Sequence, residues 1–418
     1  MPPHIAVIGA GIAGVTTAYA LSQQGYDVTV IDRQRYAGME TSFANGGQLS
    51  ASNAEVWNQW STVLKGLAWM LRNDAPLLVN LSPDWHKYSW FAEFIWNIQH
   101  YRANTVETTR LAIAARQELF AMAEREGIGF DLERRGILHV YRTQAEFERA
   151  RDVNALLVEG GLDRRAVAGE EIRSIEPAIQ SSYYAGLYTP SDCTGDIHKF
   201  TRGLAKACEK RGVRFRYETA TEGIQQRRNK IAMKTAALVE AGGNVLYADH
   251  LEFDGVVLCA GIDTRALART LGDRVNIYPV KGYSITVNLA DDASRHAAPW
   301  VSLLDDEAKI VTSRLGADRF RVAGTAEFNG PNRDIRADRI VPLVNWVRRL
   351  FPSLDTDSVV PWSGLRPMMP NMMPAVRCSR TARVFYNSGH GHLGWTLSGA
   401  TAQMVASLVS RSIPKTNT

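Results

Sequence analysis

The stretch HIAVIGAGIAG, residues 4 to 14, decides the fold of the first part of the chain. Its first five residues form an apolar strand pattern, and Gly9, Gly11 and Gly14 follow in the spacing G-x-G-x-x-G. In this motif the first glycine permits a tight turn, the second lets the backbone approach a pyrophosphate, and the third lets helix and strand pack closely. The helix predicted over residues 12 to 24 then offers free N–H groups and a partial positive charge to phosphates.

A second apolar strand is predicted over residues 26 to 31, and it ends at Asp32. A carboxylate at this place can accept hydrogen bonds from ribose hydroxyls, so the pattern predicts a βαβ unit that binds the ADP half of a dinucleotide. The alternative is a tight turn in an ordinary α/β fold. The candidate cofactor contacts here are Gly9, Gly11, Ile12, Ala13, Gly14, Asp32 and Arg33. Because the same fingerprint serves NAD and FAD, the cofactor has to be identified from other segments.

The segment ETSFANGGQ, residues 40 to 48, directly follows the predicted ribose site. Small residues with hydroxyl and amide groups suit a backbone that lies against a pyrophosphate and a flat ring, whereas the alternative is a flexible loop. The candidate contacts of this segment are Thr41, Ser42, Asn45, Gly46, Gly47 and Gln48.

The segment NSGHGHLGWT, residues 387 to 396, leads from a predicted strand into the final helix. A helix N-terminus can stabilise the negative charge that develops on a reduced flavin ring. Cofactor turns at both ends of the chain favour FAD, which is long enough to span a domain; the alternative is a glycine-rich helix start. The candidate contacts are Ala260 and Gly261, after the strand at residues 256 to 258, and Gly389, His390, Gly391, His392, Leu393, Gly394, Trp395 and Thr396.

The cofactor is expected to be bound non-covalently, because neither the segment at residues 40 to 48 nor the segment at residues 387 to 396 contains a cysteine. The four cysteines form no C-x-x-C pair and have no spacing suited to zinc, and the two histidines of the last segment alternate along a glycine turn. No metal site is therefore predicted.

Composition excludes several other classes of protein. The 418 residues, 45% hydrophobic and 22% charged, suit two or three globular domains. The net charge of +5 is spread along the chain without long basic runs, which argues against nucleic-acid binding. The chain shows neither an export signal nor an apolar run of about 18 residues, so a cytoplasmic protein, at most attached to the inner face of the cytoplasmic membrane, is expected.

Aromatic residues are concentrated between residues 53 and 102. Six of the ten tryptophans lie in this segment: Trp57, Trp60, Trp69, Trp85, Trp90 and Trp96. One interpretation is a cap with a packed aromatic core. The other is a weak peripheral membrane contact, in which tryptophans lie at the lipid interface beside Lys65, Arg72, Lys87 and Arg102.

Five motifs taken in order resemble the D-amino-acid dehydrogenase family, which belongs to the glycine oxidase and D-amino-acid oxidase group of FAD enzymes. They are GAGIAG at 9–14, ETSFANGGQ at 40–48, PVKGYS at 279–284, WSGLRPM at 362–368 and NSGHGHLGWT at 387–396. The resemblance spans nearly the whole chain.

The resemblance implies an α/β and α+β architecture. A Rossmann-type FAD domain (1–52, 183–275 and 362–418) would be interleaved with a substrate domain built on an antiparallel sheet (53–182 and 276–361). The implied reaction oxidises a D-amino acid or related amine to an imino acid, which hydrolyses to a 2-oxo acid and ammonia. Electrons would pass to a quinone or another acceptor. Two alternatives stay open: an oxygen-using oxidase of glycine, sarcosine or a cyclic secondary amine, and a non-catalytic flavin-binding interaction protein.

Single residues of these motifs are candidates for contacts with the substrate and the flavin. Arg366 matches the family's substrate-carboxylate anchor, a task that suits the bidentate guanidinium group; the alternative is a surface salt bridge. Tyr283 is a candidate second substrate contact through its hydroxyl, or else a packed core residue. Lys281 is a candidate neighbour of the flavin, or else part of a solvated face.

The chain departs from the family after the arginine motif. The family's usual Pro-Asp-Gly turn is replaced by Pro370-Asn371-Met372. Because Met372 cannot adopt a positive φ as cheaply as glycine, a reshaped loop beside the flavin is expected.

Overall fold

The structure is a computed structural model that describes residues 1–69, 76–238 and 245–415. A six-stranded sheet carries the N-terminal motif, with the strand order β19-β20-β13-β1-β2-β9. Five strands are parallel: β1 (His4–Ile8), β2 (Asp27–Ile31), β9 (Arg214–Arg216), β13 (Gly255–Leu258) and β20 (Val384–Ser388); β19 (Ala375–Cys378) is an antiparallel edge. The predicted βαβ unit and Rossmann-type sheet are therefore confirmed.

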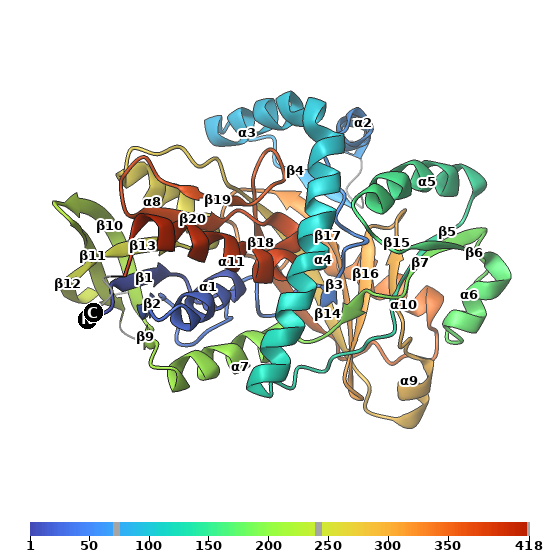
Figure 1. The fold of residues 1–418 in the computed structure, drawn as a ribbon. Coiled ribbons are helices and arrows are strands. Elements are labelled where there is room, and N and C mark those ends of the chain that lie inside the picture. The colour runs from blue at the N-terminus through green and yellow to red at the C-terminus, as the bar shows by residue number, and fades with distance from the viewer. Residues whose placement is uncertain (70–75, 239–244, 416–418) are drawn as a thin grey trace.

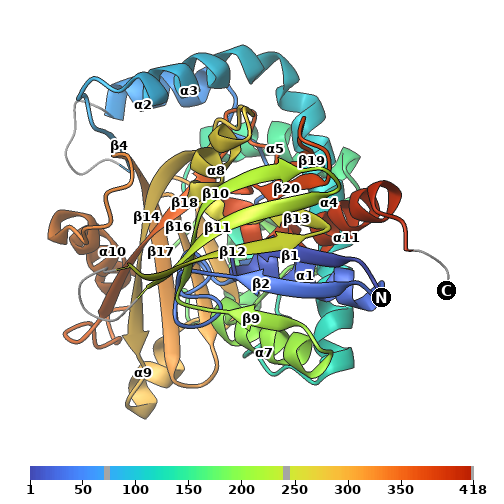
Figure 2. The ribbon, with the colours of Figure 1, turned by 90° about the vertical axis from the view of Figure 1, so that its left-hand side faces the viewer.

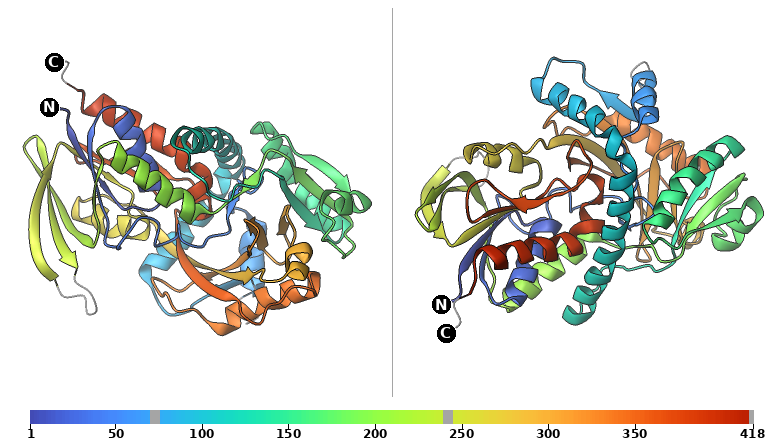
Figure 3. Two further views of the ribbon diagram at one scale, coloured as in Figure 1. Left: turned by 90° about the horizontal axis from the view of Figure 1, so that it is seen from below. Right: turned by 45° about the horizontal axis from the view of Figure 1, so that its top comes forward.

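Three helices cover one face of this sheet and lie side by side in Figure 3. They are α1 (Ile12–Gln23), α7 (Ile197–Lys210) and α11 (Gly394–Ser412). The long helix α4 (Tyr101–Glu126) packs across α11. Strand residues such as Val7 and helix residues such as Phe200 share one buried core on this side.

A three-stranded meander covers the opposite face (Figure 2). It consists of β10 (Thr219–Arg227), β11 (Lys230–Leu238) and β12 (Val245–Phe253), and its Met233 belongs to the same buried core as Ile8 of β1. The meander begins at Thr219 and ends at Phe253, and residues 255 to 258, which follow it, belong to the parallel sheet, because β13 pairs with β1.

The second domain is built on a nine-stranded sheet with the order β18-β14-β17-β16-β15-β5-β7-β6, to which β4 adds beside β17. Most neighbours are antiparallel, as predicted; the pairs β5–β15 and β4–β17 are parallel. Helix α10 (Ala337–Leu350) packs on its outer face. The strands are β4 (Leu77–Val79), β5 (Ile137–Tyr141), β6 (Arg165–Ala168), β7 (Ala185–Thr189), β14 (Tyr278–Asn288), β15 (Ser302–Asp305), β16 (Ile310–Leu315), β17 (Arg319–Phe328) and β18 (Val360–Met368).

Strand pairing moves two of the expected domain boundaries. Both β7 and β18 pair within the nine-stranded sheet, although the expected boundaries at 183 and 362 assign them to the FAD domain. We therefore propose that the chain changes domain near residues 190 and 369. The remaining elements are connecting pieces: β3 (Gln48–Leu49) pairs with β8 (Cys193–Thr194), and α5 (Gln144–Glu159), α6 (Gly169–Ile175), α8 (Thr264–Thr270) and α9 (Asp292–Ala297) are helices.

The aromatic segment forms two helices, α2 (Trp60–Trp69) and α3 (Trp85–Trp96), which lie together at the top of Figures 1 and 2. Part of this segment is packed in the core and part of it is exposed. Trp90 and Phe94 are buried against the nine-stranded sheet, whereas Trp60, Trp85 and Trp96 are exposed. The side chain of Trp69 and all of Arg72 lie outside the described residues. Within the described part of the chain, no helix is long and apolar enough to cross a membrane.

Candidate active site

A cavity of about 1570 Å³ is lined by residues from both sheets. This volume exceeds the roughly 300–1,000 Å³ of an ordinary small-ligand pocket, so the cavity has room for a large cofactor together with a substrate. Its wall contains all the sequence-predicted site residues except Gly14, Lys281 and Gly389. No cluster of three or more His, Cys, Asp or Glu side chains within the described ranges is placed to hold a metal ion.

The glycine motif forms one end of this cavity. Gly9 has a φ of 106°, and a Cβ on Gly14 would lie 1.8 Å from the carbonyl oxygen of Gly9, so only glycine permits this contact of strand and helix. At the start of α1 the N-cap, Gly11, has no side chain to cap the helix. Ser42 reaches this helix start from the second segment, and its Oγ accepts from the Ile12 backbone N–H at 3.0 Å. The other N–H groups at this helix start are available to a diphosphate, which fits the ADP half of FAD.

Asp32 lies beside the glycine turn at the predicted ribose site. Its carboxylate accepts hydrogen bonds from the backbone N–H groups of Ala10 and Gln34, at 2.5 and 2.7 Å. Burial raises the pKa of this carboxyl, and the two hydrogen bonds, which by themselves would lower it, do not outweigh burial. Because each carboxylate oxygen has a second acceptor site, the residue can still receive ribose hydroxyls.

An ionic cluster forms part of the rim. Arg33 contacts Asp263 at 3.0 Å and Glu40 at 3.2 Å, and Arg333 from the second domain also contacts Glu40. Burial by itself would raise the pKa of the Glu40 carboxyl, but pairing with Arg333 and Arg33 outweighs burial, and the pKa is lowered. Arg33 therefore lines the cavity as a paired group.

The second predicted segment runs from the glycine turn to the nine-stranded sheet. Asn45 Oδ1 accepts from the Gly47 N–H at 2.9 Å, and Gln48 Nε2 donates to Ser302 Oγ at 2.7 Å. A Cβ on Gly46 would lie 2.8 Å from Val311. The segment thus lies against the sheet, instead of forming the flexible loop that was the alternative.

The third segment brings a second helix start to the cavity. Residues 390 to 396 line it, and α11 begins at Gly394 without a side-chain cap. Gly389 has a φ of 76° and packs behind the wall against Met369. Burial lowers the pKa of His390 to about 4, and its Nε2 contacts Thr401 Oγ1 at 3.0 Å. This histidine is neutral at physiological pH.

His392 is also neutral. Burial lowers its pKa to about 4, and the nearby positive charge of Arg366 acts in the same direction. Its Nε2 lies 3.2 Å from the Asn53 carbonyl oxygen, which can only accept, so Nε2 carries the proton. The imidazole stacks on the Trp57 ring with centroids 4.7 Å apart.

Arg366 reaches the cavity from β18. A backbone bridge between Met368 and His390 holds this strand beside the third cofactor segment. The guanidinium donates from Nη1 to the Thr325 carbonyl oxygen at 3.0 Å, and no carboxylate within the described residues pairs with it. Burial lowers its pKa to about 10, so it remains protonated at neutral pH. A shielded cation without a partner anion is suited to bind a carboxylate ligand.

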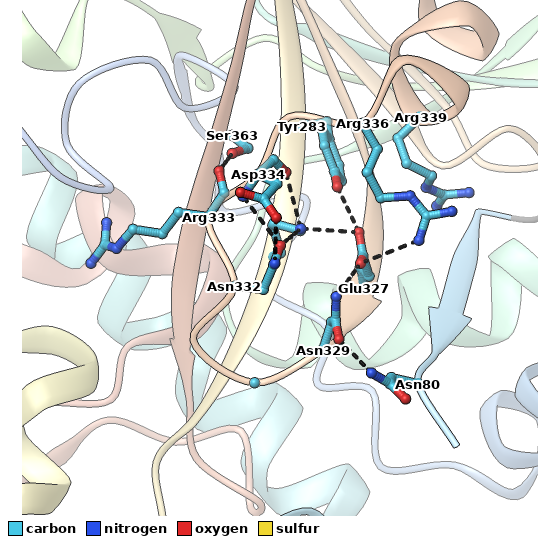
Figure 4. A network of polar contacts seen from close by, with 12 residues as sticks. Asn80, Tyr283, Glu327, Asn329, Asn332, Arg333, Asp334, Arg336, Arg339 and Ser363 are labelled. Carbon is cyan, nitrogen blue, oxygen red and sulfur yellow. Dashed lines mark hydrogen bonds and ion pairs between the residues drawn. The ribbon is translucent and has the colours of Figure 1, made fainter. Parts of the chain in front are cut away.

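Tyr283 and Lys281 differ from their candidate roles. The Tyr283 hydroxyl donates to buried Glu327 at 2.6 Å, and Figure 4 shows it directed toward Glu327 beside Arg336. Lys281 is fully buried, 3.4 Å from Glu327, and donates to Asn332 at 2.6 Å. The proton of the hydroxyl is therefore directed to Glu327, and the ammonium group belongs to a buried network instead of a solvated face or the flavin site. Tyr283 contributes to the cavity wall, but its ring belongs to the core under α10.

The loop after Arg366 keeps a tight turn despite its unusual residues. Met372 has a φ of 61°, and its N–H donates to the Met369 carbonyl oxygen at 3.0 Å. Its side chain is buried beside Trp90 and Met368. The expected reshaping is therefore absent from this turn, and apolar packing offsets the cost of the backbone conformation.

Several cavity residues were missed from the sequence. Glu55 and Trp57 directly follow the second cofactor segment, a position that could have indicated them. Glu55 accepts from the Tyr101 hydroxyl at 2.8 Å, and burial raises the pKa of its carboxyl. Arg164, just before β6 at the opposite edge of the sheet from β18, is also buried in the wall, and no carboxylate of the described residues forms an ion pair with it. Nothing local in the sequence marks Arg164 as a cavity residue.

The comparisons agree with this geometry. The sequence profile of the family described as "FAD dependent oxidoreductase" matches residues 4–408. The chain belongs to this family of FAD-dependent oxidoreductases. Its cofactor is FAD, and the uncapped helix starts, the glycine contacts and the cavity described above fit it.

This FAD-dependent oxidoreductase has curated relatives along its whole length. It is 63% identical to D-amino acid dehydrogenase 3 of Mesorhizobium japonicum over 99% of this chain and 98% of the relative. It is 41% identical to a D-amino acid dehydrogenase of Paramagnetospirillum magneticum, over 97% and 94%. A solved structure of glycine oxidase from Geobacillus kaustophilus has a TM-score of 0.73 at 19% identity, over 98% of this chain and 95% of that one, which shows the same fold.

Proposed function

We propose that this oxidoreductase oxidises D-amino acids, giving an imino acid that water hydrolyses to a 2-oxo acid and ammonia. The observation that carries the proposal is the Arg366 guanidinium, which lies in the wall shared with the cofactor segments and pairs with no carboxylate of the described residues. The names of the two relatives, both D-amino acid dehydrogenases, support the substrate class.

Arg366 binds the substrate carboxylate in this mechanism. Two parallel N–H···O bonds from a guanidinium fix both the distance and the orientation of a carboxylate. Once the carboxylate is held, the substrate Cα–H has a defined direction, and that orientation is the main contribution of the protein. FAD, when bound, supplies the hydride acceptor.

His392 keeps the electrostatics favourable for an amine. A protonated imidazole near Arg366 would repel the substrate's ammonium group, whereas the neutral ring does not. Since burial keeps the pKa of His392 near 4, the ring stays uncharged over the physiological range. The positive charge next to His392 is then that of Arg366, which matches the negative charge of the carboxylate.

Paired enantiomers test the substrate class. The purified holoenzyme is supplied with the D and L forms of one amino acid and a dye as electron acceptor, and the 2-oxo acid and ammonia are measured. We expect equal amounts of both products from the D form and little from the L form. Preference for the L form, or consumption without ammonia, would contradict the proposal.

We further propose a quinone as electron acceptor, reached at the inner face of the cytoplasmic membrane. The supporting feature is an exposed apolar surface on α2, α3 and the segment between them: Trp60, Leu64, Leu81, Trp85 and Trp96. Basic side chains contribute less to a membrane contact at this surface than the sequence suggested, because Lys87 is buried against backbone carbonyls and Arg102 pairs with Glu159. The contact would thus depend on aromatic insertion more than on charge.

Flotation with vesicles of phosphatidylethanolamine and phosphatidylglycerol tests this surface. The wild type should float with the vesicles at low salt, and replacement of Trp60, Trp85 and Trp96 by serine should prevent this. A matched variant with Tyr184→Ser, an exposed aromatic residue elsewhere, should float like the wild type. If the triple variant floats equally well, or if a short-chain quinone cannot oxidise the reduced enzyme, the membrane and quinone assignments are wrong.

A further inference from the structure

The Arg366 guanidinium lies over two paired strands at a place where both strands have a glycine, and hence no side chain. Strands β14 and β18 are antiparallel, and their register places Gly282 directly opposite Gly364. Arg366 lies two residues after Gly364, and Trp362 lies two residues before it. All four residues line the cavity.

Distances to the two glycines show what occupies the missing side-chain positions. A Cβ built on Gly282 would lie 2.3 Å from Nη2, 2.4 Å from Cζ and 2.7 Å from Nη1 of Arg366. A Cβ built on Gly364 would lie 2.1 to 2.9 Å from three ring atoms of Trp362. The guanidinium therefore rests on the bare backbone of Gly282, and the indole rests on that of Gly364.

Backbone conformation does not require glycine at either position. Neither residue has a positive φ, and both lie within regular strands. In such a strand glycine is less favourable than alanine, because it loses more conformational entropy on folding. The only structural demand for glycine here comes from the side chains that lie over it.

A bulge in the neighbouring strand completes this arrangement. Lys281 pairs with Glu327 and Tyr283 with Gly324, so two residues of β17 stand opposite Gly282. One of them, Thr325, has a φ of 60°, which a β-branched residue rarely adopts, and its carbonyl oxygen accepts from Arg366 Nη1. Strained residues of this kind often occur where a functional group must be held in position.

We infer that the Gly282–Gly364 pair positions two parts of the substrate site: Gly282 seats the carboxylate anchor Arg366, and Gly364 seats Trp362 as a wall for the substrate side chain. This inference rests on the proposed function. Both glycines are positioning residues, since neither contacts the substrate through a side chain. Thr325 holds the guanidinium from the third strand.

The geometry predicts distinct effects of alanine at the two positions. Relief of the clash at Gly282 needs the guanidinium to move from 2.3 Å to the 3.4 Å at which ordinary contact begins. A misplacement of about 1 Å can lower the rate about one-hundredfold. At Gly364 the new methyl group pushes the indole into the cavity, so substrates with large side chains should lose more than substrates with small ones.

The experiment uses Gly282→Ala and Gly364→Ala holoenzymes, each serving as the matched control for the other. Affinity for propionate, a carboxylate without an amine, is measured from the change in flavin absorbance, and kcat/KM is measured with D-alanine and D-phenylalanine. Gly282→Ala should weaken propionate binding and lower kcat/KM about one-hundredfold for both amino acids. Gly364→Ala should change the D-phenylalanine to D-alanine ratio about tenfold, with nearly unchanged propionate affinity, an effect on the order of one lost methylene contact.

A double variant separates positioning from general damage to the fold. If Gly282→Ala loses FAD or stability, Gly282→Ala combined with Arg366→Ala should recover both, because the clashing guanidinium is gone. No recovery would overturn the inference, as would wild-type propionate binding by Gly282→Ala. Failure of every amino acid to reduce the wild-type flavin would instead overturn the proposed function. Propionate binding would in that case still test whether Gly282 positions the Arg366 guanidinium. If amino acids reduce the wild type but propionate does not bind, the inference fails and the proposed function stands.

Discussion

Replacement of Arg366 by lysine keeps the positive charge of the site but removes its geometry. The guanidinium donates one hydrogen bond, from Nη1 to the Thr325 carbonyl oxygen, and its N–H groups at Nη2 and Nε can donate to a ligand. A lysine ammonium is a single point donor on a more flexible stem, so it cannot hold both carboxylate oxygens. The variant should therefore bind the substrate less firmly and in a less defined orientation.

The size of the loss follows from the bonds that disappear. One hydrogen bond to a charged group contributes about 1.5–3 kcal/mol, which corresponds to about 10- to 150-fold in kcat/KM. If the bound carboxylate is shielded from bulk water, leaving it poorly paired costs more, on the order of the 2–5 kcal/mol seen for truncated buried charge pairs. Both kcat and KM should worsen, since orientation as well as binding is lost.

Steady-state kinetics with the best D-amino acid provide the assay, together with the FAD content of each preparation. FAD should stay bound in the variant, because none of the three cofactor segments includes Arg366. Arg348→Lys is a suitable control, as this exposed arginine pairs with Asp357 at the surface. A loss of less than about fivefold in kcat/KM, roughly 1 kcal/mol, would show that the carboxylate is anchored elsewhere.

Three further predictions concern the cofactor and the stability of the fold. Asp32→Ala removes a charged acceptor from the ribose site, so FAD affinity in titrations of the apoprotein should fall about tenfold or more; unchanged affinity would place the ribose elsewhere. Acid precipitation should release all the yellow colour into the supernatant, because the cofactor segments contain no cysteine, and colour retained in the pellet would indicate a covalent link. The pKa of His390 is lowered by burial from 6.5 to about 4, so the unfolded chain takes up a proton first as the pH falls. The contribution of neutral His390 to the free energy of unfolding is thus complete above about pH 6.5 and decreases toward pH 4, by up to about 1.4 kcal/mol per pH unit. Urea unfolding at pH 7 and pH 5 should therefore show a smaller difference in the free energy of unfolding for His390→Gln than for the wild type. An equal difference in the two proteins would refute the assignment.

The cofactor site could be predicted because its residues are local in sequence. Each of the three segments combines a strand end, small residues and a helix start or tight turn, and such short-range patterns have strong backbone requirements. Gly14 is the clearest case, since the contact with the Gly9 carbonyl oxygen leaves no room for any side chain. The resemblance to a known family then supplied Arg366, which the spacing alone could not have separated from a surface arginine.

The direction of side chains in the substrate sheet could not be predicted. The motif PVKGYS suggested Lys281 and Tyr283 as site residues, yet both contact buried Glu327, and Gly282 between them faces the guanidinium. Which residues of a strand face the cavity depends on register and on the bulge at Thr325, and both are set by pairing with a strand about 40 residues away. The aromatic segment was ambiguous for a related reason, because its helices bury one side, with Trp90, and expose the other, with Trp85.

Anaerobic titration of the oxidised holoenzyme with a D-amino acid tests the central claim most directly. The visible absorption bands of the flavin should bleach fully with about one equivalent of substrate oxidised per FAD, and the L-enantiomer at the same concentration should leave them unchanged. The Arg366→Lys holoenzyme should bleach far more slowly with the same D-amino acid. A flavin that no D-amino acid bleaches, or one that both enantiomers bleach at equal rates, would contradict the account.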